Sequence, residues 1–465
     1  MSASGDTGRS VLWFRRDLRV HDHPALIAAV ARGSVAPLFV FDPRLLSGRF
    51  ASPNRLWFMK ESLRTLDGEL RARGSQLHFR VGNPAVVVPA FARDARASTI
   101  FASRDYTPFA RRRDVAVRVG LAGDGVTFSL SPGHLARAPQ HVLNAQGLPY
   151  RVFTPFSKAW AGVQTRTVLG APASVSHLAG MDAGDIPAVF DIRPTAAEMP
   201  EPGETAARSR LARWASGGLD RYAALRDRPD IDGTSGLSVD LRWGLLSPVE
   251  VLERCAGTTE SHRRFRLELA WREFFAHLLW HFPNVAGEAQ QERYRRVAWA
   301  EDADGLAAWK AGMTGYPIVD AGMRQLLATG WMHNRVRMIT ASFLVKDLLI
   351  DWREGERFFM EHLFDGDVAS NNGGWQWAAS TGADSQPYFR VFNPVLQGKK
   401  FDPEGVYVRR WVPELRGAAT DRVHEPWLAG GAPGYPPPIV DHAMARERTL
   451  AAFKQAERAA AGRTG

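Results

Sequence analysis

The first 135 residues alternate short apolar runs with amphipathic segments. The apolar runs predict strands at Val11–Phe14, Val35–Phe41, Leu77–Val81, Thr99–Ala102 and Val126–Leu130. The segments between them predict helices at Pro24–Ala31, Pro53–Arg73, Pro84–Arg96 and Phe109–Val119. Three of these helices have proline in the first turn, where its missing N–H costs nothing. The alternation indicates a Rossmann-like α/β domain with a doubly wound parallel sheet, although no GxGxxG fingerprint follows the first strand.

The rest of the chain follows a different pattern. Residues 161–207 are rich in Ala, Gly and Pro and have no long helical periodicity, which indicates a linker. Helical patterns then follow at Thr205–Leu225, Ser247–Cys255, His262–His281, Asp320–Gly330, Met332–Leu349, Glu354–Phe364 and Ala443–Ala461. We therefore predict an α/β domain over residues 1–135, a linker over 136–205 and a large all-α domain over 206–465.

The composition excludes several classes of protein. The 465 residues are 45% hydrophobic and 23% charged, and the single cysteine excludes a disulfide framework or a cysteine-rich metal site. No stretch reaches the roughly 20 apolar residues of a membrane helix, and no signal-peptide pattern precedes the first strand. We therefore expect a cytoplasmic protein.

Charge and tryptophan are unevenly distributed. Residues 1–200 carry 25 Lys and Arg against 15 Asp and Glu, whereas residues 201–465 carry 34 of each, so the net charge of +10 comes from the first part. A basic region is compatible with a nucleic-acid partner, although 52 of the 59 basic residues are Arg, which codon bias alone can produce. Eleven of the 15 tryptophans follow residue 240, and a buried indole N–H needs a partner.

Two segments of the all-α region combine groups that suit a ligand. Gly233–Ser238 joins glycine to hydroxyl residues ahead of a helix predicted to start near Ser247, which suits a phosphate. An ordinary loop with helix-capping hydroxyls is the simpler alternative. Arg266–His277 places an acid, an indole and a guanidinium on one helix face, which suits a planar, phosphate-bearing ligand. The simpler alternative there is a helix with core aromatics and solvated charges.

Two further segments carry polar groups among apolar ones. Asn334 and Met338 are i,i+4 neighbours, and the amide is either a satisfied core group or a ligand contact. Asp365–Ser380 gathers acids, amides, glycines and two tryptophans within 16 residues. Glycine lets backbone approach a ligand, and the acids and amides offer directed hydrogen bonds. No histidine or further acid completes a metal site, so we expect no metal.

Several of these segments together resemble one protein family. They are WFRRDLR at Trp13–Arg19, Thr234–Ser238, WREFF at Trp271–Phe275, Thr314–Leu327, WMHNRVRMITASFLVKDLL at Trp331–Leu349 and NNGGWQWAAS at Asn371–Ser380. The chain is similar in these segments to the class I cyclobutane pyrimidine dimer photolyases of the photolyase/cryptochrome family. The resemblance covers essentially the whole chain and is weakest in the linker.

The resemblance implies a light-driven DNA repair enzyme with an antenna domain followed by a helical FAD-binding domain. Reduced, anionic FAD would donate an electron to a flipped-out cyclobutane pyrimidine dimer, which splits into two pyrimidines. A dimer pairs and stacks poorly, so it is extruded at lower cost than normal bases. The implied partner is UV-damaged DNA, and a monomer with no membrane association and no obligate protein partner is expected.

The resemblance also assigns roles to individual residues. The implied catalytic residues are Glu268, Asn334, Met338 and Asn371. Substrate and DNA contacts fall to Trp271, Arg272, Phe275, Arg335, Trp377 and Gln397. The implied electron-transfer residues, leading from the flavin to the surface, are Trp375, Trp352 and Trp299. FAD binding falls to Tyr222, Thr234, Ser235, Gly236, Leu237, Ser238, Phe265, Arg337, Asp365, Gly366 and Asp367, with Arg337 placed to pair with Asp365.

Two differences from the family and one similarity to some of its members refine the expected cofactors. Gly236 stands where relatives often have an arginine of the phosphate loop, and Phe265 stands where some have tryptophan. Pro108–Ala110, which precedes Arg111–Asp114, is similar to relatives whose antenna is 8-hydroxy-5-deazaflavin. We therefore expect that chromophore before 5,10-methenyltetrahydrofolate.

The expected substrate follows from the pocket residues. Relatives that repair (6-4) photoproducts place histidines where this chain has Asn334 and Met338, so dimer repair is expected. Two alternatives stay open, a cryptochrome photoreceptor on the same fold and a non-catalytic DNA-binding helical protein.

Overall fold

The N-terminal region forms an all-parallel sheet with strand order β3-β2-β1-β4-β5. The computed structural model describes residues 8–48, 50–385 and 387–461. Its strands are β1 (Gly8–Phe14), β2 (Gly33–Phe41), β3 (His78–Val81), β4 (Thr99–Ser103) and β5 (Thr127–Ser131). The order changes direction at β1, so the predicted doubly wound arrangement is confirmed.

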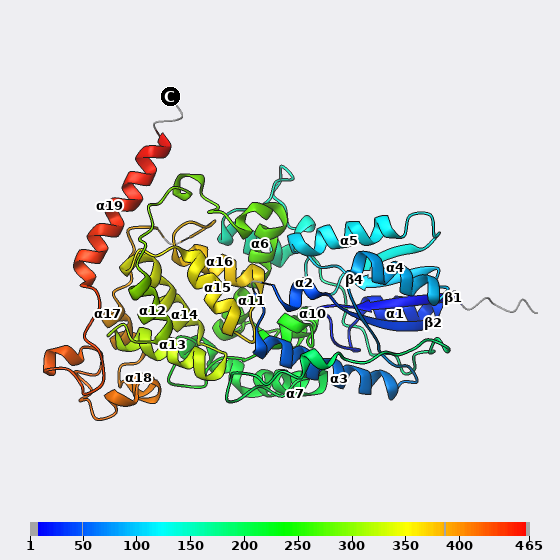
Figure 1. The fold of residues 1–465 in the computed structure, drawn as a ribbon, viewed down its shortest axis with the longest axis horizontal. Coiled ribbons are helices and arrows are strands. Elements are labelled where there is room, and N and C mark those ends of the chain that lie inside the picture. Colours follow the sequence, from blue (N-terminus) through cyan, green and yellow to red (C-terminus); the bar gives the residue numbers. More distant parts are fainter. Residues whose placement is uncertain (1–7, 49, 386, 462–465) are drawn as a thin grey trace, which may run out of the picture.

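Helices cover both faces of this sheet (Figure 1). They are α1 (Pro24–Arg32), α2 (Pro43–Leu46), α3 (Pro53–Arg71), α4 (Pro84–Asp94) and α5 (Pro108–Gly120), and proline opens each one. Side chains alternate along β1, so Leu12 and Phe14 join the core that contains α1 and α3. Val11 and Trp13 join the core that contains α4 and α5. Both faces of the strand are therefore buried, as in other parallel sheets.

The all-α domain occupies the other end of the molecule (Figure 1). Its helices are α7 (Glu204–Arg213), α8 (Tyr222–Leu225), α9 (Ser238–Trp243), α10 (Pro248–Arg254), α11 (Glu260–His281), α12 (Ala303–Ala311), α13 (Pro317–Thr329), α14 (Asn334–Ser342), α15 (Trp352–His362), α16 (Val368–Ala378), α17 (Pro394–Phe401), α18 (Val406–Trp411) and α19 (His442–Ala461). None of the helices in the described ranges is both long enough and apolar enough to cross a bilayer.

Three local features differ from the prediction. The predicted linker contains helix α6 (Phe153–Gly162), which forms because Phe156 and Trp160 bury against the helical domain. The loop ending at Ser238 leads directly into α9, which was not predicted, whereas the helix predicted to start near Ser247 is present as α10, which the Ser247 side chain caps. Two predicted long helices are interrupted by π-helical turns, at Trp214–Gly218 and Phe343–Asp347.

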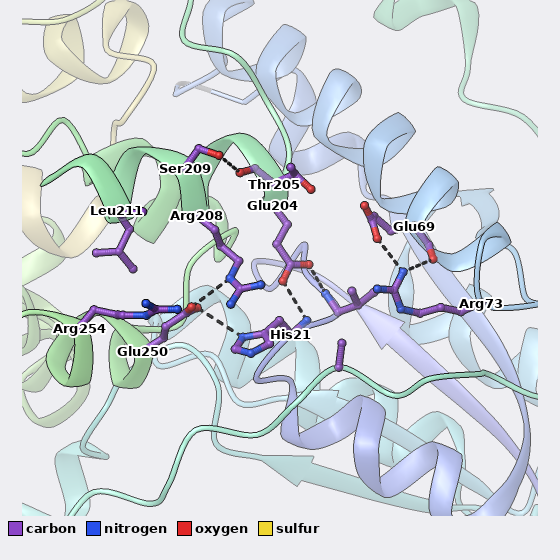
Figure 2. Close-up of a pocket in the computed structure, with 13 residues that line it drawn as sticks. His21, Glu69, Arg73, Glu204, Thr205, Arg208, Ser209, Leu211, Glu250 and Arg254 are labelled. Atoms are coloured by element: carbon purple, nitrogen blue, oxygen red, sulfur yellow. Dashed lines mark hydrogen bonds and ion pairs between the residues drawn. The ribbon is translucent and has the colours of Figure 1, made fainter. Parts of the chain in front are cut away.

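A cavity of about 490 Å³ lies where the α/β domain meets α7 and α10 (Figure 2). The Glu204 carboxylate accepts hydrogen bonds from the backbone N–H groups of Val20 at 2.6 Å and His21 at 3.0 Å. Glu250 pairs with Arg208 at 3.0 Å and with the His21 ring at 3.5 Å. These carboxylates on the helical domain therefore fix the loop that follows β1.

Candidate active site

A second cavity, of about 470 Å³, lies inside the all-α domain. That volume is in the range of small-molecule sites. Most of the predicted site residues line it, and they come from α9, α11, α14, α16 and the segments that precede α9 and α16. These are Ser235, Leu237, Ser238, Phe265, Glu268, Trp271, Arg272, Phe275, Asn334, Arg335, Arg337, Met338, Asp365, Gly366, Asp367, Asn371, Trp375 and Trp377.

Asp365 connects two helices of the predicted cofactor site, α9 and α14. The hydroxyl of Ser238, at the start of α9, donates to its Oδ2 at 2.7 Å. Arg337 donates to the same oxygen at 2.9 Å and forms an ion pair with the carboxylate. The Arg337 guanidinium is also held by the carbonyl of Met332 at 2.7 Å. Its positive charge is therefore fixed in the cavity wall.

Asp367 is surrounded by basic groups. Its Oδ1 caps α16 by accepting from the N–H of Ser370 at 3.0 Å, and its Oδ2 pairs with Arg16 from the loop after β1. Burial raises the pKa of Asp367, but three guanidinium groups outweigh burial and hold the pKa well below its usual range. These groups belong to Arg16, Arg242 and Arg272. Asp367 therefore carries a full negative charge at neutral pH.

Both arginines predicted to contact DNA are held by protein partners. Arg272 lines the cavity and donates to the carbonyls of His134 and Leu241, both at 3.2 Å. It therefore lies within the site instead of on an open surface, because these carbonyls hold its guanidinium. Arg335 lines the cavity and pairs with Asp227 at 2.8 Å.

Most of the predicted substrate residues lie on α11 and α14. On α11, the carboxylate of Glu268 pairs through Oε1 with Arg226 at 2.5 Å. On α14, the amide nitrogen of Asn334 lies 3.9 Å from the sulfur of Met338. Trp271, one turn beyond Glu268, turns its indole toward the same cavity. Acid, amide, thioether and indole groups thus converge on one space.

The side chains of α16 complete the wall. The amide nitrogen of Asn371 donates to the carbonyl of Glu356 at 2.9 Å, which leaves its Oδ1 available. Trp375 is 2% exposed and packs edge-on against Phe359 and Trp309, at ring distances of 4.9 and 6.0 Å. A polar amide and a buried indole therefore adjoin the cavity from the same helix.

Six predicted residues do not line the cavity. They are Tyr222, Thr234, Gly236, Trp352, Trp299 and Gln397. Tyr222 supports the wall indirectly, since its ring packs edge-on against that of Phe265 at 5.6 Å. Trp352 is 1% exposed and belongs to the same hydrophobic core as Trp375. Gln397 is on α17, outside the cavity.

Residues that sequence reasoning missed also shape the site. Arg226 and Arg242 line the cavity, and Arg16 reaches it from the α/β domain. The one available signal was the WFRRDLR segment, which contains Arg16 directly after a predicted strand. Arg226 and Arg242 had no such signal, because arginine is common in this chain.

The cavity fits the FAD that the resemblance implies. Within the described residues, Nη1 of Arg242 is buried without a hydrogen-bond partner, so it can donate to a bound group. Gly374 lines the cavity, and a Cβ at this position would meet no atom within 4 Å. No cluster of three or more His, Cys, Asp or Glu that could hold a metal occurs in the described ranges.

Two family models match the chain. One, described as DNA photolyase, matches residues 10–173, and the other, described as the FAD binding domain of DNA photolyase, matches residues 265–455. A deoxyribodipyrimidine photo-lyase from Escherichia coli (strain K12) is 41% identical and covers 96% of this chain and 99% of its own length. One from Thermus thermophilus is 42% identical, with 95% and 98% covered.

Solved structures give the same assignment. A bacterial class III photolyase from Agrobacterium tumefaciens superposes with a TM-score of 0.92 at 38% identity, covering 98% of this chain and 99% of that one. An archaeal photolyase from Sulfolobus tokodaii with two FAD molecules has a TM-score of 0.86 at 34% identity, with 96% and 100% covered. A cryptochrome from Synechocystis sp. PCC6803 has a TM-score of 0.88 at 30% identity, with 96% and 99% covered. With both family models matched and relatives near 40% identity over nearly its whole length, the chain belongs to the DNA photolyase family.

Proposed function

We propose that this chain is a deoxyribodipyrimidine photo-lyase, which uses light to split cyclobutane pyrimidine dimers in UV-damaged DNA. One observation carries the proposal: the residues that fit FAD and those that fit a dimer line a single cavity. Ser238, Arg337 and Asp365 form one part of its wall, and Glu268 and Trp271 form another. An electron donor and an acceptor bound there are neighbours.

The cofactor side of the cavity provides fixed charge. FAD, when bound, supplies the light absorption and the transferable electron. Arg337 is held by Asp365 and by a backbone carbonyl, so its cation does not have to reorganise when a negative charge enters the cavity. Asn371 presents its Oδ1 and Arg242 its free Nη1 for hydrogen bonding to the bound group.

The substrate side provides apolar faces and one carboxylate. Trp271 and Trp377 offer indole faces on which extruded bases stack. Glu268 uses Oε1 for Arg226, so Oε2 can accept from a base N–H. Asn334 and Met338 line the same space from α14. The dimer, whose pyrimidine rings keep polar edges, is thus held by its faces and its edge.

The test is repair of UV-damaged oligo-thymidine under blue light, with the flavin chemically reduced. We expect thymine absorbance to return in the light and not in the dark. Glu268→Ala should lower the repair yield per photon while flavin content, read from visible absorbance, stays unchanged. Absence of any light-dependent return by flavin-loaded protein would refute repair.

The same measurements separate the two alternatives. A cryptochrome shares this fold, and a flavin-loaded photoreceptor would show flavin bands without dimer repair. A helical DNA-binding protein without redox chemistry would be colourless after purification. Flavin absorbance together with light-dependent repair is expected only from a photo-lyase.

We also propose a cytoplasmic monomer whose antenna is 8-hydroxy-5-deazaflavin in preference to 5,10-methenyltetrahydrofolate. The support is α5, which opens with Pro108–Ala110, the segment on which the resemblance to deazaflavin-binding relatives rests. Phe109 lies under the Arg44 guanidinium at 5.1 Å. Absorbance spectra of the released chromophores distinguish deazaflavin, folate, a second FAD and an empty site, and light scattering gives the oligomeric state.

A further inference from the structure

The indole of Trp271 is stacked on a residue of the predicted linker. The ring of Phe153, the first residue of α6, lies parallel to it with a centroid distance of 3.6 Å and an interplanar angle of 7°. Aromatic pairs ordinarily prefer offset or edge-on arrangements over this direct overlap. The surroundings of the two rings therefore impose the stack, and it covers one face of the indole.

The position of Phe153 is itself fixed from a distant segment. Its backbone N–H, which has no partner within α6, donates to Oδ2 of Asp384 at 3.0 Å. Asp384 lies in the loop after α16 and adopts φ +49°, a conformation uncommon for a residue with a side chain. Phe153 is 8% exposed and also packs edge-on against Phe274 at 5.7 Å. The ring is therefore held by its backbone and by the core.

We propose that Phe153, fixed by Asp384, is a positioning residue for dimer recognition. It holds the Trp271 indole at one orientation, so that its other face receives a flipped-out base. This inference rests on the proposed function, because it explains how Trp271 is oriented to stack on a dimer. An indole without this backing can rotate about its side-chain bonds, and the dimer then has to order it on binding.

The direct test is the dark affinity of FAD-loaded protein for an oligonucleotide with one thymine dimer and for the undamaged sequence. Phe153→Leu is expected to weaken dimer binding about three- to tenfold, the value of one aromatic contact, and to leave undamaged DNA unaffected. Flavin content should be that of wild type, and Phe153→Tyr, which keeps the ring, should restore most of the dimer affinity. A loss of fold would lower flavin content and affect both DNAs alike.

A matched control lies one turn along the same helix. Phe156 packs against Phe274 and His277, at 5.0 Å from each ring, and has no ring contact with Trp271 among those described. Phe156→Leu should lower thermal stability without changing the preference for dimer DNA. If Phe156→Leu and Phe153→Leu weaken dimer binding equally, the effect belongs to α6 packing and the proposal fails.

Two further variants keep the test decisive. Asp384→Ala removes the backbone anchor at an exposed position and should weaken dimer binding in the same direction as Phe153→Leu, whereas Asp384→Asn keeps an acceptor oxygen and should lie nearer wild type. In a Trp271→Ala background, Phe153→Leu should have no additional effect, because it acts through the indole. Wild-type dimer affinity in both Phe153→Leu and Asp384→Ala would overturn the proposal. Equal binding of both DNAs by wild-type protein would instead refute the proposed function.

Discussion

Asp367 links the two domains and caps α16. Replacing it with asparagine, which removes only the charge, measures how much that charge stabilises the fold. Asp367→Asn keeps the shape of the side chain and an oxygen for the N–H of Ser370, but removes the charge facing three guanidinium groups. Removing one partner of a buried ion pair costs about 3–5 kcal/mol. The Asp367 side chain is 15% exposed, so solvent screens part of the loss. We therefore expect a loss of about 2–3 kcal/mol in the free energy of unfolding.

The assay is urea unfolding of flavin-free protein followed by tryptophan fluorescence. Asp367→Ala also loses the cap on α16 and should cost about 1 kcal/mol more than Asp367→Asn. As a matched control, Asp421 pairs with Arg422 at 3.3 Å but its side chain is 72% exposed. Asp421→Asn should therefore change the free energy of unfolding by less than about 0.5 kcal/mol.

The pH dependence of this loss has a definite sign. The folded-state pKa of Asp367 lies below its unfolded value, so the stabilisation is complete above that unfolded value of about 3.9 and is lost only as pH falls through the folded pKa. The gap between wild type and Asp367→Asn should therefore be constant from about pH 6 to 8. An Asp367→Asn midpoint equal to wild type, or a gap that changes over this range, would refute the charge assignment.

Three other outcomes are expected. Trp375→Phe should slow photoreduction of the flavin, and unchanged photoreduction kinetics would remove Trp375 from the electron path. Repair by chemically reduced protein should persist, because the buried Nε1 has no described partner to lose. Burial lowers the pKa of His277 and of His333 to about 4. Below about pH 6.5 the folded state therefore binds fewer protons than the unfolded state, so the urea midpoint should fall as pH drops from about 6.5 to 4. A Cβ at position 373 would overlap the Phe275 ring, so Gly373→Ala should cost about 1–3 kcal/mol of unfolding free energy, whereas Gly374→Ala should be neutral or stabilising because its Cβ would meet open space.

The pattern of apolar residues was sufficient to predict the α/β domain. Each strand of a parallel sheet is a short apolar run, and proline opens each of the helices α1 to α5, so the boundaries agree with the prediction to within a few residues. The same rules missed α16, because Asn371, the glycines and the polar positions around them have the composition of a loop. That helix forms because Asp367 caps it and because Trp375 and Ala378 bury against the core.

The residue types of the site were predictable, but the contacts that hold them were not. Glu268 pairs with Arg226 across 42 positions, and Asp367 pairs with Arg16 across 351 positions. Arg226 is not distinguished by its local sequence, since Arg supplies most of the basic residues of this chain, and the WFRRDLR segment that contains Arg16 does not indicate which carboxylate it meets. Hydrophobic periodicity reports which face of an element is buried, and it carries no information on which charge lies opposite.

These long-range pairs give the α/β domain a part in the chemistry of the helical domain. Arg16 leaves the end of β1 and neutralises Asp367, the residue that caps the helix bearing Asn371 and Trp375. The loop that carries Arg16 is held in turn by the N–H of Leu18 on the carbonyl of Trp243 at 3.1 Å, at the end of α9. A shift of the sheet against the helices would therefore move α16 and the cavity wall with it. Close packing of the two domains is thus a condition for the geometry of the site.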